Sequence, residues 1–232
     1  QVVGVARHVD QALLSDRRLA DADACNTDAR AAFLKEVETL IGTPGDGASL
    51  SNRIAALGAS LVAAASRPDS PARLQSVLDA AGSVAGHLSA LTGAVQTARS
   101  EADDAIATQV GRLNDSLAQI DRLNAAIVAE RAAGRDANAL LDQRQNLANK
   151  VAEIVPIREV ARDHGQIALF TTGGAILLEG TPANIGFIPV GVVTADMTLS
   201  SGALSGLSIN GVAVQSGDGG VLGGGALGAA FA

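Results

Sequence analysis

The spacing of apolar residues changes once along this chain, near Pro156. Before that residue, apolar side chains recur at steps of three, four and seven, which places them on one face of a helix. After it, short runs alternate with period two and are separated by glycine-containing turns, as in antiparallel strands. The pattern predicts an α+β fold: an elongated helical bundle or coiled-coil trunk, with a small antiparallel β domain inserted before a C-terminal return.

The helical part is expected to contain consecutive helices separated by corners rich in proline and glycine. The first covers Val5–Ile41 and ends at the turn that begins with Thr43. The second starts at Ser49 or Ser51 and continues to about Ser66. The third is one very long helix from Pro71 to about Ala133, because Pro71 is tolerated in the first turn of a helix.

The long third helix carries a coiled-coil-like seam. Its members follow steps of three, four and seven: Leu74, Leu78, Ala81, Ala85, Leu88, Ile106, Val110, Leu113, Leu117, Ile120 and Ile127. The stretch Ala94–Ala105 is more polar, so we expect a bend or a change of packing partner there.

A fourth helix lies in Ala137–Arg158, where the two architectures meet. Asn138 is expected to cap its start, since a short polar side chain satisfies free amides of a first turn. Pro156 is expected to end it, because the residue before a proline is pushed out of the helical region. The apolar positions share one face: Leu140, Leu147, Val151 and Ile154.

Arg144 stands inside this apolar stripe. An unpaired buried charge costs several kcal/mol or more, so we predict that Arg144 is buried and paired. The expected acceptors are a carboxylate or backbone carbonyls of the loop Gly134–Ala137. Asp142, two residues away, points to another side of the helix and needs a separate partner. We interpret Arg144 as a structural clamp and not as a catalytic residue.

The region after Pro156 is expected to form short strands. Hairpins are predicted around Asp163-His164-Gly165, Gly173-Gly174 and Asn210-Gly211, because such turns favour antiparallel pairing. The predicted strands are residues 157–162, Gln166–Thr172, Ala175–Glu179, one or two within Thr181–Pro189, weaker ones at Val190–Thr194 and Met197–Leu199, and a hairpin in Leu207–Val214. The expected domains are a helical trunk at 1–156, a β-rich domain at 157–221 and a return segment at 222–232.

Composition narrows the classes of function. Of 232 residues, 47% are hydrophobic but only 2% are aromatic, so the packing must rely on Ala, Leu, Val and Ile. The net charge of −7 argues against binding to nucleic acid, which needs clustered Lys and Arg, and against an anionic membrane surface. The chain contains no run of eighteen apolar residues, so the sequence predicts no membrane-spanning helix.

The residues that could carry chemistry are isolated. Cys25 is the single cysteine and lies among carboxylates, which disfavour a reactive thiolate, so it is interpreted as passive. His8, His87 and His164 stand alone, as surface, packing or turn residues. The glycine-rich run Gly217–Phe231 lacks the Lys-Ser/Thr of a phosphate-binding loop. We therefore assign no catalytic, cofactor-binding or metal-binding residue, no cofactor and no enzymatic activity.

One motif resembles a known family. Ala137–Leu147 reads Ala-Asn-x-Leu-Leu-Asp-x-Arg-x-x-Leu, which resembles the signature of the hook-associated protein 1 family, the hook–filament junction proteins of bacterial flagella. Members usually carry acidic residues where Ala139 and Gln145 stand. Other stretches that resemble the family are Val5–Leu14, Pro68–Leu78, the helix from Arg112 onward, and Leu222–Ala230.

The resemblance implies a structural subunit that works by assembly. Such a subunit is exported through the flagellar secretion apparatus, is extracellular, and forms a ring of its own copies next to the hook protein and the second junction protein. A chaperone would bind a C-terminal segment. The chain opens on Gln1, so we expect a core fragment that lacks both terminal helical segments and is monomeric. The alternatives are the second junction protein, a flagellin, and more distantly a helical sensor ectodomain or a cryptic enzyme.

Overall fold

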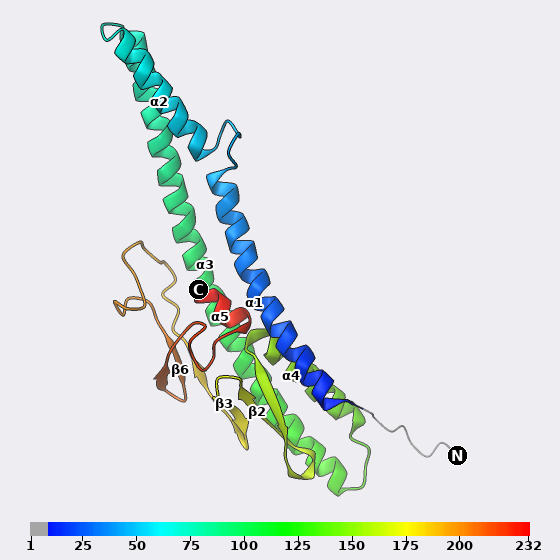
Figure 1. Ribbon diagram of the computed structural model, residues 1–232. Helices are drawn as coiled ribbons and strands as arrows, with labels where there is room; N and C mark the ends of the chain where they lie inside the picture. The colour runs from blue at the N-terminus through cyan, green and yellow to red at the C-terminus, as the bar shows by residue number, and fades with distance from the viewer. Residues whose placement is uncertain (1–8) are drawn as a thin grey trace. The chain divides into compact units, whose positions relative to one another are not determined.

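The computed structural model describes residues 9–232, which form long helices and two small antiparallel sheets (Figure 1). The helices are α1 Gln11–Ile41, α2 Leu50–Ser66, α3 Pro71–Ala132, α4 Asn138–Ile154 and α5 Gly225–Ala230. The strands are β1 Ile157–Ala161, β2 Ile167–Thr171, β3 Ile176–Glu179, β4 Thr181–Pro182, β5 Ile185–Gly186, β6 Leu207–Ile209 and β7 Val212–Val214. The predicted α+β class is confirmed. The part of the first expected helix before residue 9 lies outside the described residues.

The described chain divides into two compact units. The first, here the sheet unit, comprises residues 9–30, 101–192 and 196–232; the second, here the helical unit, comprises 31–100 and 193–195. The change of unit at Ser100/Glu101 falls in the stretch of α3 where a change of partner was expected. The expected domains at 1–156, 157–221 and 222–232 were defined by the change from helical to strand pattern, whereas these two units are defined by which residues contact one another.

In the helical unit, polar contacts connect the antiparallel helices α2 and α3. Ser49 caps α2 by accepting a hydrogen bond from the Asn52 amide at 3.3 Å, as its position predicted. Arg53 Nη1 donates to Ser83 Oγ at 2.5 Å, and Arg73 Nη1 donates to the Ala63 carbonyl at 2.7 Å. Both arginines therefore join α2 to α3 within this unit.

The predicted seam on the first half of α3 is wrong. Leu74, Leu78 and Leu88 are 48%, 65% and 47% exposed. The half-buried positions form the adjacent stripe: Arg73, Val77, Ala80, Val84, His87, Leu91, Ala94 and Ala98. Two neighbouring apolar stripes share this part of the helix, and both have coiled-coil spacing. Periodicity alone therefore could not tell which of the two stripes is covered.

The second half of the seam is confirmed and forms the core of the sheet unit. Ile106, Val110, Leu113, Leu117, Ile120 and Ile127 are all at most 5% exposed. The first five of these pack in one cluster with Val151 and Ile154 of α4 and with apolar residues of both sheets. The α3–α4–sheet arrangement thus buries a single continuous core in this unit.

The start of α4 differs from the prediction and its end agrees. Asn138 is the first helical residue, and its amide donates to the Asp136 carboxylate at 2.8 Å, so Asp136 supplies the side-chain acceptor expected from Asn138. At the other end, Val155 adopts an extended conformation ahead of Pro156. The proline therefore ends the helix and leads directly into β1, as predicted.

The first sheet has the order β1-β2-β3-β4 and the second β5-β6-β7, all antiparallel. Ile157 pairs with Thr171 and Ala161 with Ile167, across a turn in which His164 and Gly165 have φ values of 56° and 83°. Asn210 and Gly211 have φ values of 52° and 81°, as a type I′ hairpin requires. These predicted hairpins are confirmed.

The two weaker strand predictions, Val190–Thr194 and Met197–Leu199, are wrong. Both stretches are irregular. The amides of Val190 and Gly191 donate to Asp103 Oδ2 at 2.6 and 3.0 Å, so α3 takes hydrogen bonds that a partner strand would need. Gly191 also has a φ of 82°, which interrupts extended backbone.

The glycine-rich C-terminal run makes a close backbone contact and not a phosphate loop. Gly225 has a φ of 60°, and a Cβ at this position would overlap the Ile154 carbonyl at the end of α4. Leu222 and Leu227 are buried, and α5 packs against α4 in the sheet unit. Asn26 Nδ2 of α1 donates to the Gly225 carbonyl at 2.9 Å. Glycine is therefore needed where the chain begins α5.

Candidate functional site

The residues with potential chemistry remain apart in the structure. Among residues 9–232, no group of three His, Cys, Asp or Glu side chains could hold a metal ion. His87 is half-buried in α3 and its Nε2 has no hydrogen-bond partner, while His164 is exposed in the turn between β1 and β2. His8 lies outside the described residues. None of the described helices is both long and apolar enough to cross a bilayer.

Cys25 lies half-buried on α1. Burial raises the pKa of its thiol, and the carboxylates of Glu153, Asp21 and Asp28 raise it further. Only the thiolate is nucleophilic, so the raised pKa lowers its reactivity. This agrees with the prediction that nearby negative charge makes Cys25 a passive thiol.

Arg144 is buried, as predicted, at 8% exposure. Its Nη1 donates to Asn124 Oδ1 at 2.8 Å and to the Gly165 carbonyl at 2.7 Å. These acceptors come from α3 and from the β1–β2 turn, whereas the prediction named a carboxylate or carbonyls of the loop Gly134–Ala137. Asp142 is exposed on a different side of α4, as its spacing predicted. Arg144 thus connects α4 to the first hairpin.

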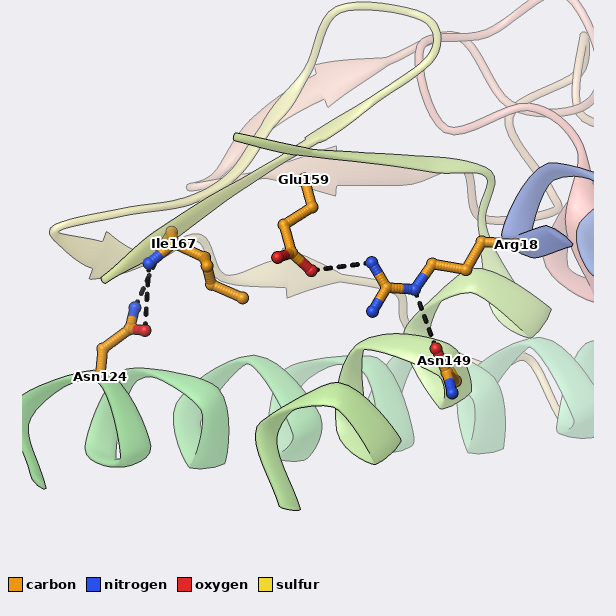
Figure 2. Close-up of polar contacts among 5 residues, drawn as sticks. All are labelled: Arg18, Asn124, Asn149, Glu159 and Ile167. Atoms are coloured by element: carbon orange, nitrogen blue, oxygen red, sulfur yellow. Dashed lines mark hydrogen bonds and ion pairs between the residues drawn. The ribbon is translucent and has the colours of Figure 1, made fainter. Parts of the chain in front are cut away.

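Arg18 forms a second buried contact that sequence reasoning missed. It is 2% exposed on α1; its Nε donates to Asn149 Oδ1 of α4 at 2.9 Å and its Nη1 to Glu159 Oε2 of β1 at 2.7 Å. Figure 2 shows the guanidinium between these two partners. Arg18 therefore ties three elements of the sheet unit together. The available signal was the spacing of Leu14, Arg18 and Ala22, which are all buried on one face of α1.

Three side chains of α3 bind the backbone of the β region. Asn124 donates to the Ile167 carbonyl at 2.9 Å and accepts from the Ile167 amide at 3.2 Å (Figure 2). Asn114 does the same with Ile185, at 2.8 and 2.9 Å. Asp103 accepts from the loop at Val190 and Gly191.

These three positions are 10 or 11 residues apart, which is about three helical turns, so they lie on the same side of α3. We call them the backbone-binding ladder. The ladder fixes β2, β5 and the 190–191 loop at successive levels of one helix. A buried amide that pairs both its donor and its acceptor specifies a single register, since a shifted register would leave backbone groups unsatisfied.

The helical unit exposes apolar side chains on all its helices. Phe33 and Leu34 of α1 are 46% and 64% exposed, and Leu61 and Val62 of α2 are 51% and 73% exposed. Leu74, Leu78 and Leu88 of α3 are exposed as well. Large exposed apolar side chains are typical of a site that contacts another protein where they form one patch.

These features define a class of protein, an α+β scaffold. In it, buried polar side chains of a long helix hold the backbone of the strands and loops, and apolar side chains of the helices are left exposed. The family model described as "Flagellar hook-associated protein FlgK helical domain" matches residues 34–232. The chain belongs to this family.

Curated relatives agree with the family match. Flagellar hook-associated protein 1 of Salmonella typhimurium strain LT2 is 25% identical over 184 residues, covering 78% of this chain and 33% of the relative. The Escherichia coli K12 protein of the same name is 24% identical over 184 residues, with the same coverage. The chain therefore spans about a third of the length of these relatives.

A solved structure has the same fold. The flagellar hook junction protein FlgK from Burkholderia pseudomallei superposes with a TM-score of 0.74 at 19% identity, covering 94% of this chain and 38% of that chain. The likeness extends over helices and sheets alike. It supports the assignment of nearly the whole described chain to one known α+β architecture.

Proposed function

We propose that this chain is part of a structural subunit of the bacterial flagellum, at the junction between hook and filament. The observation that carries the proposal is the family match over residues 34–232. The names of the curated relatives and of the solved structure point to the same place in the flagellum. The subunit is extracellular and acts by assembly with other flagellar components.

The scaffold suits a structural role. Catalysis needs titratable groups that converge on a pocket. Here Arg18, Arg144 and the backbone-binding ladder instead hold helices and strands together. The proposal therefore includes no catalysis and no cofactor. Residues 1–156 would act as the helical trunk, 157–221 as an inserted β-rich domain and 222–232 as the return toward the trunk.

The partners follow from the proposed location. The subunit would contact further copies of itself in a ring, the hook protein on one side and the second junction protein on the other. An export chaperone would recognise a C-terminal segment of a family-length protein. The 232-residue chain by itself should be monomeric at micromolar concentration, because a net charge of −7 opposes self-association.

Deleting the gene in its source bacterium tests the proposal. We expect cells with hooks but without attached filaments by electron microscopy, and with filament protein released into the medium. Expression of the intact gene from a plasmid should restore filaments. Normal filaments after deletion would contradict the proposal. Loss of a sensory response in cells with normal filaments would favour the sensor alternative, and loss of the filament protein itself would favour a flagellin.

A further inference from the structure

The two units of the chain differ in how much they bury. In the helical unit, residues 31–100 and 193–195, the buried residues are Ser49, Ala64 and Val193. The described members of the apolar core cluster all lie in the sheet unit. Few buried apolar contacts and many solvent-exposed backbone hydrogen bonds are the features of a region that opens below the free energy of global unfolding. The helical unit has these features.

Glycines weaken the helices of this unit further. Gly58 lies inside α2, and Gly82, Gly86 and Gly93 lie inside α3. A Cβ at any of these four positions would meet nothing within 4 Å, so no close contact within the chain requires glycine there. Glycine is the least favourable residue after proline in a helix interior. Both helices are therefore less stable than alanine at the same positions would make them.

Polar contacts couple α2 to the first half of α3. Arg53 of α2 donates to the Ser83 hydroxyl of α3, and Arg73 of α3 donates to the Ala63 carbonyl of α2. These two contacts need both helices in place, because each joins a side chain of one helix to an acceptor of the other. Loss of either helix removes both contacts, so the two helices should open as one event.

An irregular segment holds α3 at the end of this unit. We call residues 190–195 the strap. In the helical unit, the Val193 amide donates to Ser100 Oγ at 3.0 Å, and Arg99 Nη1 donates to the Thr194 carbonyl at 2.9 Å. Val193 itself is 3% exposed. The strap therefore contacts α3 where the helical unit ends.

The strap continues into the sheet unit, where Asp103 of α3 accepts from the amides of Val190 and Gly191. Asp103 is 6% exposed. Unwinding of α3 past residue 98 would separate the strap amides from their acceptors and leave a poorly solvated carboxylate without its donors. Unsatisfied buried groups of this kind are costly. An opening of the helical unit should therefore stop at residues 99–103.

We propose that α2 and the first half of α3, residues 50–98, open together in the free chain while the sheet unit stays folded, and that the strap marks where the opening ends. The chain then consists of a rigid base and a helical hairpin that can change its packing to fit a neighbour. The inference goes beyond the proposed function and does not depend on it.

Hydrogen exchange followed by mass spectrometry on the purified chain tests this. Amides in residues 50–98 should exchange at least about a hundredfold faster than those in residues 106–127, which are also helical. In urea below the global transition, the exchange of α2 and of the first half of α3 should rise together. Equal protection of the two ranges would overturn the proposal, and so would separate opening of the two helices.

Ala64→Gly and Ala65→Gly form a matched pair in α2. Both carry the same loss of helix propensity, but Ala64 is buried and Ala65 is exposed. Ala64→Gly should speed exchange across residues 50–98, in α3 as well as α2, several-fold more than Ala65→Gly, with no change at residues 106–127. An effect of Ala64→Gly confined to α2 would refute opening as one event.

Asp103→Ala tests the strap, with Asp104→Ala at the exposed neighbouring position as its control. Asp103→Ala should speed exchange about tenfold in residues 94–103 and in the strap, and leave residues 50–90 unchanged, whereas Asp104→Ala should do neither. Ser100→Ala removes the hydrogen bond from Val193 and should have the same effect to a smaller degree, which keeps the test open if Asp103→Ala does not fold. Faster exchange in the strap alone would refute its role as the boundary. Because these measurements use the purified chain, their outcome is separate from that of the gene deletion.

Discussion

Asn124 binds the backbone of Ile167 at both of its polar groups, donating to the carbonyl at 2.9 Å and accepting from the amide at 3.2 Å. A helix side chain thus provides β2 with the hydrogen bonds that a neighbouring strand would provide. The same oxygen of Asn124 also accepts from Arg144. One buried amide therefore joins α3, α4 and the first hairpin.

Replacing Asn124 with alanine should lower the free energy of unfolding by about 3 kcal/mol or more. The change leaves the Ile167 amide and carbonyl and the Arg144 guanidinium short of a buried partner, at about 1–3 kcal/mol per unsatisfied group. Chemical denaturation followed by circular dichroism measures the loss. Gln119→Ala, at an exposed position of the same helix, is the control and should change stability by less than about 0.5 kcal/mol. Equal effects of the two changes would show that the ladder contributes nothing specific.

Arg18→Ala should lower the free energy of unfolding more than the neighbouring substitution Arg17→Ala. Arg18 is 2% exposed and its partner Glu159 is 18% exposed, so removing the arginine leaves a carboxylate in a poorly solvated place. Breaking a buried pair in this way costs about 3–5 kcal/mol. Arg17 pairs with Asp21 on the surface, with side chains 54% and 46% exposed, and its loss should cost at most about 1 kcal/mol.

A double-mutant cycle with Glu159→Gln separates the pair from simple loss of packing. If the ion pair matters, Arg18→Ala should cost clearly less in the Glu159→Gln background, because no charged partner is left behind. An Arg18→Ala cost that stays the same in both backgrounds would show that Arg18 acts only by filling space. Urea denaturation of the four proteins gives the required free energies of unfolding.

Sequence reasoning located the features that depend on neighbours along the chain. Ser49, Pro156 and the Asn210-Gly211 turn act within a few residues, so their local chemistry predicted where α2 starts, where α4 ends and where β6 turns into β7. The burial of Arg144 followed in the same way from its place in a helical stripe. These predictions needed no knowledge of the tertiary structure.

Features that depend on distant contacts were not predictable. The spacing of Leu14, Arg18 and Ala22 could have indicated that Arg18 is buried, but its partners, Asn149 and Glu159, lie 131 and 141 residues away and cannot be identified from that spacing. The irregular stretch at Val190–Thr194 reads as a strand because its side chains are apolar, but Asp103 accepts hydrogen bonds from its backbone. On the first half of α3, two neighbouring stripes have the same helical spacing, and only the burial seen in the structure shows which of them is covered.

The thiol of Cys25 should react with iodoacetamide more slowly in the folded chain than in urea. Burial and the nearby carboxylates raise its pKa, so its rate should rise at higher pH than that of an ordinary thiol with a pKa near 8.5. The exposed Ala90→Cys thiol in a Cys25→Ser background is the control.

The raised pKa of Cys25 also predicts how the stability of the chain changes with pH. Because the folded pKa lies above the unfolded value, the stabilising contribution is present below the unfolded pKa and is lost as pH rises through the folded pKa. The free energy of unfolding should therefore fall in this alkaline range more for the natural chain than for Cys25→Ser. A pH profile of alkylation identical in folded and unfolded chains would contradict the raised pKa.

Gly225→Ala should release the C-terminal segment from α4. Gly225 has a φ of 60°, and an added Cβ would overlap the Ile154 carbonyl, so alanine is disfavoured both by conformation and by contact. A non-glycine residue in the left-handed region costs about 1–2 kcal/mol before any overlap is counted. The buried side chains of Leu222 and Leu227 depend on this contact. Hydrogen exchange should therefore become faster in residues 222–232 than in the natural chain.

Gly111→Ala provides a control of opposite sign. Gly111 lies in the middle of α3 with nothing within 4 Å of an added Cβ, so alanine should stabilise the chain by up to about 1 kcal/mol through helix propensity. The same substitution should thus lower stability at position 225 and raise it at 111. If Gly225→Ala left both the free energy of unfolding and the exchange of residues 222–232 unchanged, the close approach of α5 to the end of α4 would be wrong. The glycine-rich run would then have to be explained by something other than this backbone contact.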